Sequence, residues 1–263
     1  MSINNGGIIV VHQLLAQMEN GYMKIIKENL VGIYLHGSYA FGTYCHSVSD
    51  LDVLIVVYEK LTIDEKKQLL DYTINILDKW APKKGIEFHV LQLKDTINLS
   101  YPIPFDLHFS PIHRSRYLTN KNKYIEDMMG YDEDLVALAH LMITKLYGKV
   151  LVGKPIDSVF GWIDQKKYFE SIVADVKEAK KEIVQQPMYV ILNLCRVMAF
   201  KQENKILSKR AGGEWGLVHF PTNYHSLIQL ALKEYRGETV LLEQYNDSEL
   251  NDFADITLSL LFK

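Results

Sequence analysis

The sequence has few cysteines, no long hydrophobic run and no excess of basic residues. Its two cysteines, Cys45 and Cys195, lie far apart, and neither has a C-x-x-C partner. We therefore expect neither a disulfide framework nor a zinc site, and a protein of a reducing compartment. No apolar run approaches the ~18 residues of a membrane helix, and the N-terminal segment lacks the basic stretch of a signal peptide. We expect a cytoplasmic protein with no membrane partner.

The charge and the composition narrow the class further. The formal net charge is −3 and the isoelectric point is about 6.3. The overall charge therefore provides no electrostatic attraction for a long nucleic acid. With 48% hydrophobic and 23% charged residues, the composition is that of a folded protein. A chain of 263 residues is long enough for one large domain or two modest ones. We expect no nucleic-acid partner.

The most informative stretch contains two apolar runs, Val31–His36 and Val53–Val57. Both have the length and the β-branched content of strands. The first stops at Gly37-Ser38, a pair typical of a turn that leads into a helix. Backbone N–H groups and a hydroxyl at a helix start favour an anion such as a triphosphate. The second run is uninterrupted, which predicts a strand buried on both faces.

Two carboxylates lie at the start of the second strand. Asp50 and Asp52 are separated by Leu51, and residues i and i+2 of a strand point to the same side. Two like charges held this close repel each other unless a cation lies between them. Mg²⁺ takes one or two protein carboxylates and completes its shell with water and substrate phosphates. The pattern favours a magnesium and phosphate site, whereas an isolated Asp-x-Asp is more often a solvated strand end.

These residues carry a resemblance to a known family. The pattern GS(x)₁₀SDLD, followed by an apolar strand, resembles the signature of the nucleotidyltransferase superfamily of the polymerase β type. The run Lys84–Leu91 resembles the third strand of that fold, which carries a third carboxylate, here Glu87. Four later segments resemble the aminoglycoside adenylyltransferases that modify streptomycin and spectinomycin: Tyr131–His140, Leu192–Ala199, Ser208–Trp215 and Leu230–Gly237.

The resemblance implies a role for each matched residue. Asp50 and Asp52 are expected to hold Mg²⁺. Glu87 is expected to take the proton of the attacking hydroxyl, which requires a carboxylate within hydrogen-bond reach of it. ATP, the co-substrate, is expected to contact residues from both halves of the chain: Gly37, Ser38, Ser49, Asp134, Arg196, Lys209 and Tyr235.

Ordinary explanations exist for several of these residues. Glu87 also fits a solvated strand face, and Arg196 and Lys209 also fit a helix surface. Asp134 also fits the first turn of a helix, where the dipole favours an acid. The segment 98–115 is rich in aromatic residues and histidines but has no steady period, and its histidines, His108 and His113, lack metal-ligand spacing. We interpret both histidines as structural.

The hydrophobic pattern predicts an α/β (α+β) N-terminal domain with a mixed sheet, followed by an all-α helical-bundle domain. In the first domain, residues 1–150, helices are expected at 8–30, 38–44, 63–80 and 135–147, and a third strand at 86–93. Gly148–Pro155 is the predicted linker. In the second domain, residues 151–263, helices are expected at 164–185, 188–202, 208–218, 223–235 and 247–262. We expect the helical domain to close the active-site cleft.

The expected activity is transfer of AMP from ATP to a hydroxyl of an aminoglycoside or aminocyclitol antibiotic, with release of pyrophosphate. In the family that the chain resembles, members that modify streptomycin carry a Trp, an acidic residue and a Gly-Asp-Glu-Arg-Asn run. These residues precede the helix that corresponds to the one holding Arg196 here. The corresponding stretch here, Glu182–Val190, has no Trp and no such run. Spectinomycin is therefore favoured over streptomycin. We expect an antibiotic-resistance enzyme that is a monomer.

Two other classes of function remain open. A protein of this fold can modify another protein, as some toxins do, but the full-sized helical second domain argues against that reading. A nucleotide-binding regulator without transfer activity is the other alternative. The complete set of Asp50, Asp52 and Glu87 argues against it, because a protein that only binds a nucleotide needs no base.

Overall fold

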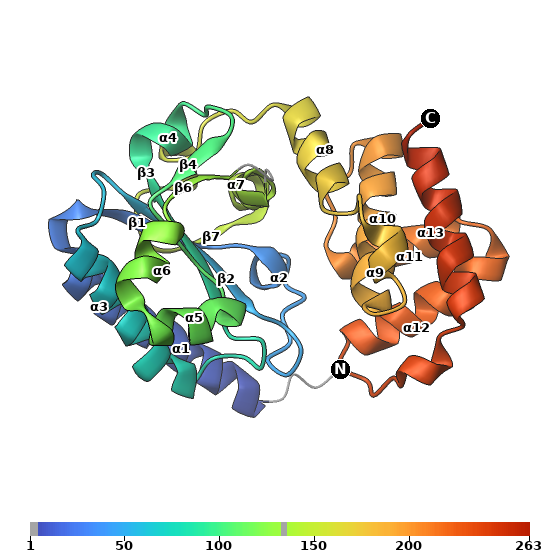
Figure 1. The fold of residues 1–263 in the computed structure, drawn as a ribbon, viewed down its shortest axis with the longest axis horizontal. Helices are drawn as coiled ribbons and strands as arrows, with labels where there is room; N and C mark the ends of the chain where they lie inside the picture. The colour runs from blue at the N-terminus through green and yellow to red at the C-terminus, as the bar shows by residue number, and fades with distance from the viewer. Residues whose placement is uncertain (1–4, 133–135) are drawn as a thin grey trace. The chain divides into compact units, whose positions relative to one another are not determined.

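A five-stranded mixed sheet forms from the apolar runs of the first part of the chain (Figure 1). The computed structural model describes residues 5–132 and 136–263. The strand order is β5-β3-β2-β1-β7, in which β2 and β3 are parallel and the other neighbours are antiparallel. The bounds are β1 Leu30–Leu35, β2 Leu51–Val57, β3 Ile86–Gln92, β5 Leu107–Phe109 and β7 Lys149–Gly153. The predicted mixed sheet is confirmed.

The central strand β2 is buried on both faces, as its uninterrupted apolar run predicted. Residues 53–57 are all fully buried. Helices α1 (Asn5–Ile26) and α3 (Ile63–Asn75) lie side by side against one face of the sheet (Figure 1). Burying one such aliphatic side chain contributes about 1.5–3 kcal/mol. The core on that face joins both helices to the strands: Leu14, Met18, Tyr22, Leu69, Ile74, Ile33, Ile55 and Val57.

Helix α3 begins at a capping box. The Thr62 side chain accepts a hydrogen bond from the Glu65 N–H at 3.2 Å, and the Glu65 carboxylate accepts one from the Thr62 N–H at 2.7 Å. The helix predicted to reach residue 80 ends at Asn75 instead. Ile76 has a φ of −111°, far from the helical value, and a separate 3-10 turn follows at Leu77–Lys79.

Shorter elements complete the first part of the chain. The helices are α2 Gly37–Ala40, α4 Leu93–Ile97, α5 Arg114–Thr119, α6 Lys121–Asp127 and α7 Val136–Tyr147. A separate two-stranded sheet pairs β4 (Ile103–Phe105) with β6 (Gly130–Asp132). Further 3-10 turns lie at Lys27–Asn29, Pro111–His113 and Ile156–Ser158.

The chain divides into two compact units, Met1–Ile163 and Asp164–Lys263. The stretch predicted as a linker, Gly148–Pro155, mostly forms β7, which pairs with β1 in the register Tyr34 to Val150. The linker prediction was wrong. Glycine and lysine occur at both ends of this short edge strand, at 148–149 and 153–154, and such residues are more typical of a loop than of a strand.

The second unit is all-helical, as predicted. Its helices are α8 Gln165–Ala174, α9 Ala179–Glu182, α10 Pro187–Glu203, α11 Lys209–His219, α12 His225–Tyr235 and α13 Asp247–Leu261, with 3-10 turns at Thr222–Tyr224 and Leu242–Gln244. The single helix predicted over 164–185 is interrupted at residues 175–178, between α8 and α9. Val176 in this interruption and Ala179 at the start of α9 are both buried. Among the described residues, no helix combines the length and the apolar character that a membrane span requires.

Candidate active site

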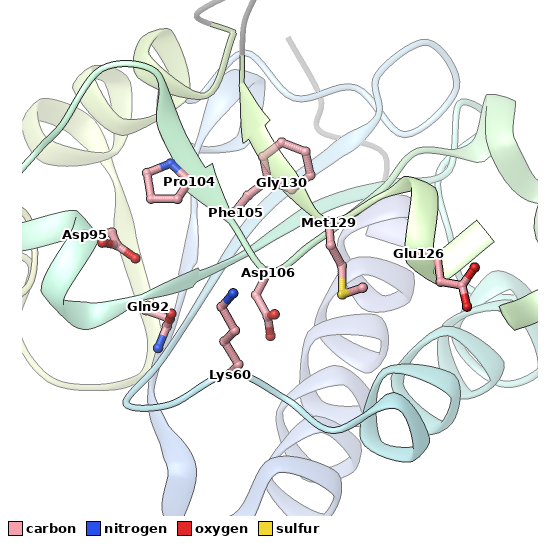
Figure 2. Close-up of a pocket in the computed structure, with 9 residues that line it drawn as sticks. All are labelled: Lys60, Gln92, Asp95, Pro104, Phe105, Asp106, Glu126, Met129 and Gly130. Carbon is pink, nitrogen blue, oxygen red and sulfur yellow. The ribbon is translucent and has the colours of Figure 1, made fainter. Parts of the chain in front are cut away.

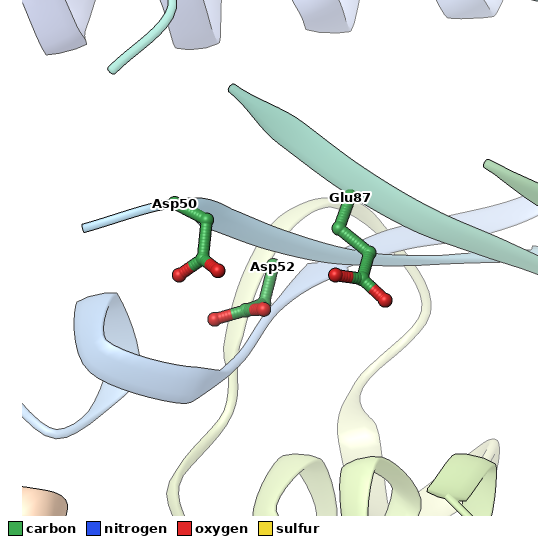
Figure 3. Close-up of side chains that lie close together, drawn as sticks. All are labelled: Asp50, Asp52 and Glu87. Carbon is green, nitrogen blue, oxygen red and sulfur yellow. The ribbon is translucent and has the colours of Figure 1, made fainter. Parts of the chain in front are cut away.

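Three carboxylates converge at one edge of the sheet. Because β2 and β3 are parallel neighbours, their N-terminal ends meet there, and Asp52 lies beside Glu87 in the register. Asp50, immediately before β2, is the third member. One carboxylate oxygen from each residue lies within 4.8 Å of the others, and all three residues are half-buried. Figure 3 shows the three side chains directed toward the same space. The predicted convergence of these acids is confirmed.

Gly37 lies directly against one of these carboxylates. The chain leaves β1 at His36, whose N–H donates to the Asp52 carbonyl oxygen at 3.1 Å. Gly37 follows with a φ of +55°, in the left-handed region that favours glycine. A Cβ at this position would lie 1.8 Å from the Asp52 Oδ2 atom. The start of α2 can therefore approach the acids closely only because residue 37 is a glycine.

The two serines of the motif have different surroundings. The Oγ atom of Ser38 is buried and makes no hydrogen bond within the described part of the chain. A buried hydroxyl without a partner is costly, so this atom is ready to bond to a ligand. The Oγ atom of Ser49, by contrast, accepts a hydrogen bond from the Cys45 N–H at 3.0 Å. Ser49 therefore supports the loop that leads to the acids.

Glu87 has a hydrogen-bond partner that the sequence did not reveal. Its Oε1 atom lies 3.2 Å from Nε2 of His108. Burial raises the pKa of the Glu87 carboxyl, but the hydrogen bond from His108 and the nearby His140 and His113 together outweigh burial. The pKa of Glu87 is consequently lowered from its ordinary value. Glu87 is ionised near neutral pH and can accept a proton.

His108 belongs to a cluster of histidines. Its ring stacks on His89 with the ring centres 4.1 Å apart and the planes at 10°. His36 and His140 continue the cluster, with ring centres 4.7 Å apart. Burial lowers the pKa of His36 and His89 well below the ordinary value, with a further contribution from the neighbouring histidines. The interpretation of His108 as merely structural missed its contact with Glu87. The signal available was its place in a short alternating run, Leu107–Phe109.

The second unit holds three more of the predicted site residues, Arg196, Lys209 and Tyr235. Nε of Arg196 donates to the Leu207 carbonyl oxygen at 2.8 Å, and its NH1 group donates to Asn193 Oδ1 at 2.9 Å. The Lys209 ammonium lies 4.4 Å from the centre of the Tyr189 ring. Tyr235 is the half-buried last residue of α12. The remaining predicted residue, Asp134, lies outside the described residues.

The two cations, Arg196 and Lys209, belong to one connected cluster. Tyr189, beneath the Lys209 ammonium, donates its hydroxyl to Asp175 at 3.2 Å, and the Asn193 amide donates to the same carboxylate at 3.5 Å. Asn193 in turn accepts from Arg196. Two positive charges held by one network suit a ligand with several negative charges.

Family models match both units. The nucleotidyltransferase domain model matches residues 21–141, and the model of the aminoglycoside adenylyltransferase C-terminal domain matches residues 158–259. The chain belongs to the aminoglycoside nucleotidyltransferase family. It is therefore an enzyme of the nucleotidyltransferase class.

Individual members of the family resemble the chain over most of its length. A spectinomycin 9-adenylyltransferase of Staphylococcus aureus is 26% identical over 230 residues, which cover 82% of this chain and 83% of the relative. An aminoglycoside (3'') (9) adenylyltransferase of Klebsiella pneumoniae is 22% identical over 237 residues, covering 87% and 86%. A crystal structure of the spectinomycin adenyltransferase AAD(9) from Enterococcus faecalis with ATP and spectinomycin has the same fold. The TM-score is 0.79 at 22% identity, with 96% and 99% of the two chains covered.

A cavity of about 300 Å³ lies elsewhere in the first unit (Figure 2). Lys60, Asp95 and Gln92 are among the residues that line it. Gln92 ends β3, whereas Glu87 lies near the start of the same strand, about 16 Å away at the usual rise per residue. None of the three converging acids lines this cavity. The cavity and the three acids are therefore separate features of the first unit.

Proposed function

We propose that this enzyme transfers AMP from ATP to a hydroxyl of an aminocyclitol or aminoglycoside antibiotic, with spectinomycin favoured over streptomycin. The observation that carries the proposal is the convergence of Asp50, Asp52 and Glu87 within 4.8 Å. The names of the relatives support the acceptor class, since they include spectinomycin 9-adenylyltransferases and aminoglycoside (3'') (9) adenylyltransferases. ATP is supported as the donor because the AAD(9) structure contains it.

The donor set of the site fits Mg²⁺. Hard carboxylate oxygens are the ligands that this ion prefers, and it commonly takes only one or two of them from the protein. Asp50 and Asp52 would hold the ion, because they lie on either side of the start of β2 and share a direction. When bound there, Mg²⁺ would offset the negative charge of the phosphate oxygens. This assignment leaves Glu87 free for proton transfer.

Glu87 would act as the general base. The oxygen of the acceptor hydroxyl forms a bond to the α-phosphorus of ATP, and the bond from that phosphorus to the bridging oxygen breaks. Pyrophosphate leaves, and the hydroxyl proton passes to the Glu87 carboxylate. The lowered pKa of Glu87 keeps it ionised for this step. A positioned base of this kind contributes a factor of about 10²–10⁴ in rate.

The other predicted residues would bind the nucleotide. Gly37 brings backbone close to the acids. The buried Ser38 hydroxyl, which has no hydrogen-bond partner among the described residues, offers a hydrogen bond to a phosphate oxygen. Arg196 and Lys209 would make charge-assisted hydrogen bonds to phosphates. Tyr235 would contact the nucleotide by stacking or through its hydroxyl. Asp134 would also contact the nucleotide, and Ser49 would act by supporting the loop before Asp50.

The proposed choice of acceptor rests on the stretch from the end of α9 to the first turn of α10. Residues 182–190, with the sequence EIVQQPMYV, lack the Trp and the acidic run on which streptomycin recognition was expected to depend. Spectinomycin is therefore the acceptor that we expect to be modified fastest.

A panel experiment tests the proposal. Purified enzyme, Mg²⁺ and each nucleoside triphosphate in turn are incubated with spectinomycin, streptomycin, a lincosamide or a protein extract, and the products are identified by mass spectrometry. We expect adenylylated spectinomycin and free pyrophosphate when ATP is the nucleotide, and no product with the other nucleoside triphosphates. Modification of a protein instead, or nucleotide binding without any product, would establish one of the two alternative classes. Transfer that persists in chelator would remove the proposed role of Mg²⁺.

A further inference from the structure

The imidazole of His108 is hydrogen-bonded to one oxygen of the Glu87 carboxylate. The two side chains come from neighbouring antiparallel strands, β5 and β3, and their contact is 3.2 Å long. Their side chains are 20% and 25% exposed, so water competes weakly for this hydrogen bond. A carboxylate can only accept, so Nε2 of His108 carries the proton of the bond. One oxygen of Glu87 is thereby fixed, and the other is left for an acceptor hydroxyl.

The His108 backbone is held from two sides. Its N–H donates to the Met128 carbonyl oxygen at 3.1 Å. Its carbonyl oxygen accepts from the Tyr124 hydroxyl at 2.9 Å, and Tyr124 is itself buried. In β5 it stands opposite His89 of β3. Main-chain movement at this position would break all of these bonds together.

The ring of His108 is fixed as well. It lies flat on the ring of His89, and His89 is only 5% exposed. Phe105 and His113 contact it edge-on, with ring centres 6.4 and 5.9 Å away. Stacking fixes the plane of the imidazole, and the strand fixes its position. Nε2 is therefore aimed at Glu87 before any ligand binds.

Glu87 needs such support because its side chain is flexible. A glutamate has several rotatable bonds, and a base that is displaced by about 1 Å loses about 10²-fold in rate. We propose that His108 is the positioning residue of the catalytic base, holding the Glu87 carboxylate in the orientation that accepts the proton of the acceptor hydroxyl. This inference rests on the proposed function, in which Glu87 is that base.

Paired substitutions test the role of His108. His108→Leu keeps the approximate size of the side chain but removes the donor, whereas His108→Gln keeps an N–H donor near the position of Nε2. We expect kcat to fall about 10–100-fold in His108→Leu, with the KM values for ATP and acceptor within twofold of the wild type. His108→Gln should recover most of kcat. His12→Leu is the matched control, because His12 is an exposed histidine of α1 outside this cluster.

A double variant shows whether His108 acts through Glu87. Residues that act as one unit have non-additive effects, so adding His108→Leu to Glu87→Gln should lower kcat no further. A crystal structure of His108→Leu should show the Glu87 carboxylate turned away from its wild-type position, a readout that is independent of activity. If the wild type transfers no AMP, the proposed function fails. If it does, equal kcat values in wild type and His108→Leu, or equal losses in the Leu and Gln variants, overturn the positioning role alone.

Discussion

Gly37 and Asp52 are in such close contact that no side chain fits between them. A Cβ at residue 37 would lie 1.8 Å from the Asp52 Oδ2 atom and 2.6 Å from Cγ. The two residues are separated by fourteen positions of loop and short helix, yet the backbone of one packs on the carboxylate of the other. The glycine of the motif thus sets both the path of the chain and the place of the acid.

Gly37→Ala should therefore damage the site more than the fold. We expect the added methyl group to displace the Asp52 carboxylate and lower AMP transfer at least about 100-fold. Gly42→Ala is a matched control, because Gly42 also has a positive φ, +70°, but has nothing within 4 Å of its would-be Cβ. Both variants should lose about 1–2 kcal/mol of unfolding free energy from backbone strain. Steady-state rates and urea unfolding measure the two effects, and equal activities of the two variants would contradict the prediction.

Removal of single acids should abolish transfer without unfolding the protein. We expect Asp52→Asn to lower kcat at least about 100-fold through lost charge stabilisation, and Glu87→Gln to lower it about 10²–10⁴-fold through loss of the base. Asp64→Asn serves as the control, since the Asp64 side chain is 85% exposed on α3. Product formation is followed by mass spectrometry and folding by circular dichroism. Retained turnover in either purified variant would show that its acid has been assigned the wrong role.

Breaking a buried ion pair outside the site should strongly destabilise the first unit. Nζ of Lys66 lies 2.7 Å from Asp106 Oδ1, with the side chains 2% and 1% exposed, and the Leu61 N–H donates to the same carboxylate. Lys66→Met leaves a buried charge without its partner, so we expect a loss of about 3–5 kcal/mol in unfolding free energy. Lys67→Met removes a half-buried cation 4.0 Å from the exposed Asp64 carboxylate and should cost at most about 1 kcal/mol. Urea unfolding of both variants decides whether burial makes this difference.

Stability should fall as the pH falls below about 6.5. Burial lowers the pKa of His89 well below its ordinary value of 6.5, so the unfolded chain binds a proton that the folded chain excludes. The contribution of His89 is fully present above pH 6.5 and is lost as the pH drops toward the folded pKa, at about 1.4 kcal/mol per pH unit. Urea unfolding at pH 8 and pH 5.5 should show a smaller difference in His89→Gln than in the wild type. His12→Gln, at an exposed position of α1, should leave the difference unchanged.

Arg196 should matter for ATP affinity. Arg196→Gln removes a charge but keeps a polar side chain of similar length. We expect the Kd for ATP to rise about 10–100-fold, because charge-assisted hydrogen bonds contribute about 1.5–3 kcal/mol. Arg210→Gln is the control, since Arg210 is exposed and pairs with Glu214 one turn away. Isothermal titration calorimetry with ATP measures both, and an unchanged Kd in Arg196→Gln would remove this residue from the nucleotide site.

The sequence predicted the acids of the site because they depend on local spacing. Asp50 and Asp52 share a side through the two-residue period of a strand, and Val53–Val57 identified that strand as buried. The helix predicted over 208–218 is likewise found at Lys209–His219, one residue from the predicted bounds at each end. In each case the pattern and the structure obey the same short-range rule.

Features that depend on strand pairing were missed. His108 contacts Glu87 because β5 pairs with β3, and the three-residue alternating run that forms β5 is too short to reveal this register. β7 was taken for a linker for the same reason, since its pairing with β1 joins residues far apart in the chain. Long-range register is set by the whole core, so a single segment does not reveal it.

β7 lies far after β1 in the sequence, and this has a consequence for the protein during synthesis and for truncated fragments of it. β1 is synthesised early, yet the strand that covers its second edge, β7, is synthesised more than 100 residues later, at residues 149–153. Until then, β1 exposes unpaired backbone groups, the kind of surface that draws chains into aggregates. A fragment stopped at residue 141, where the match to the nucleotidyltransferase domain model ends, would keep that exposed edge permanently, whereas one carried through Ile163 would close it.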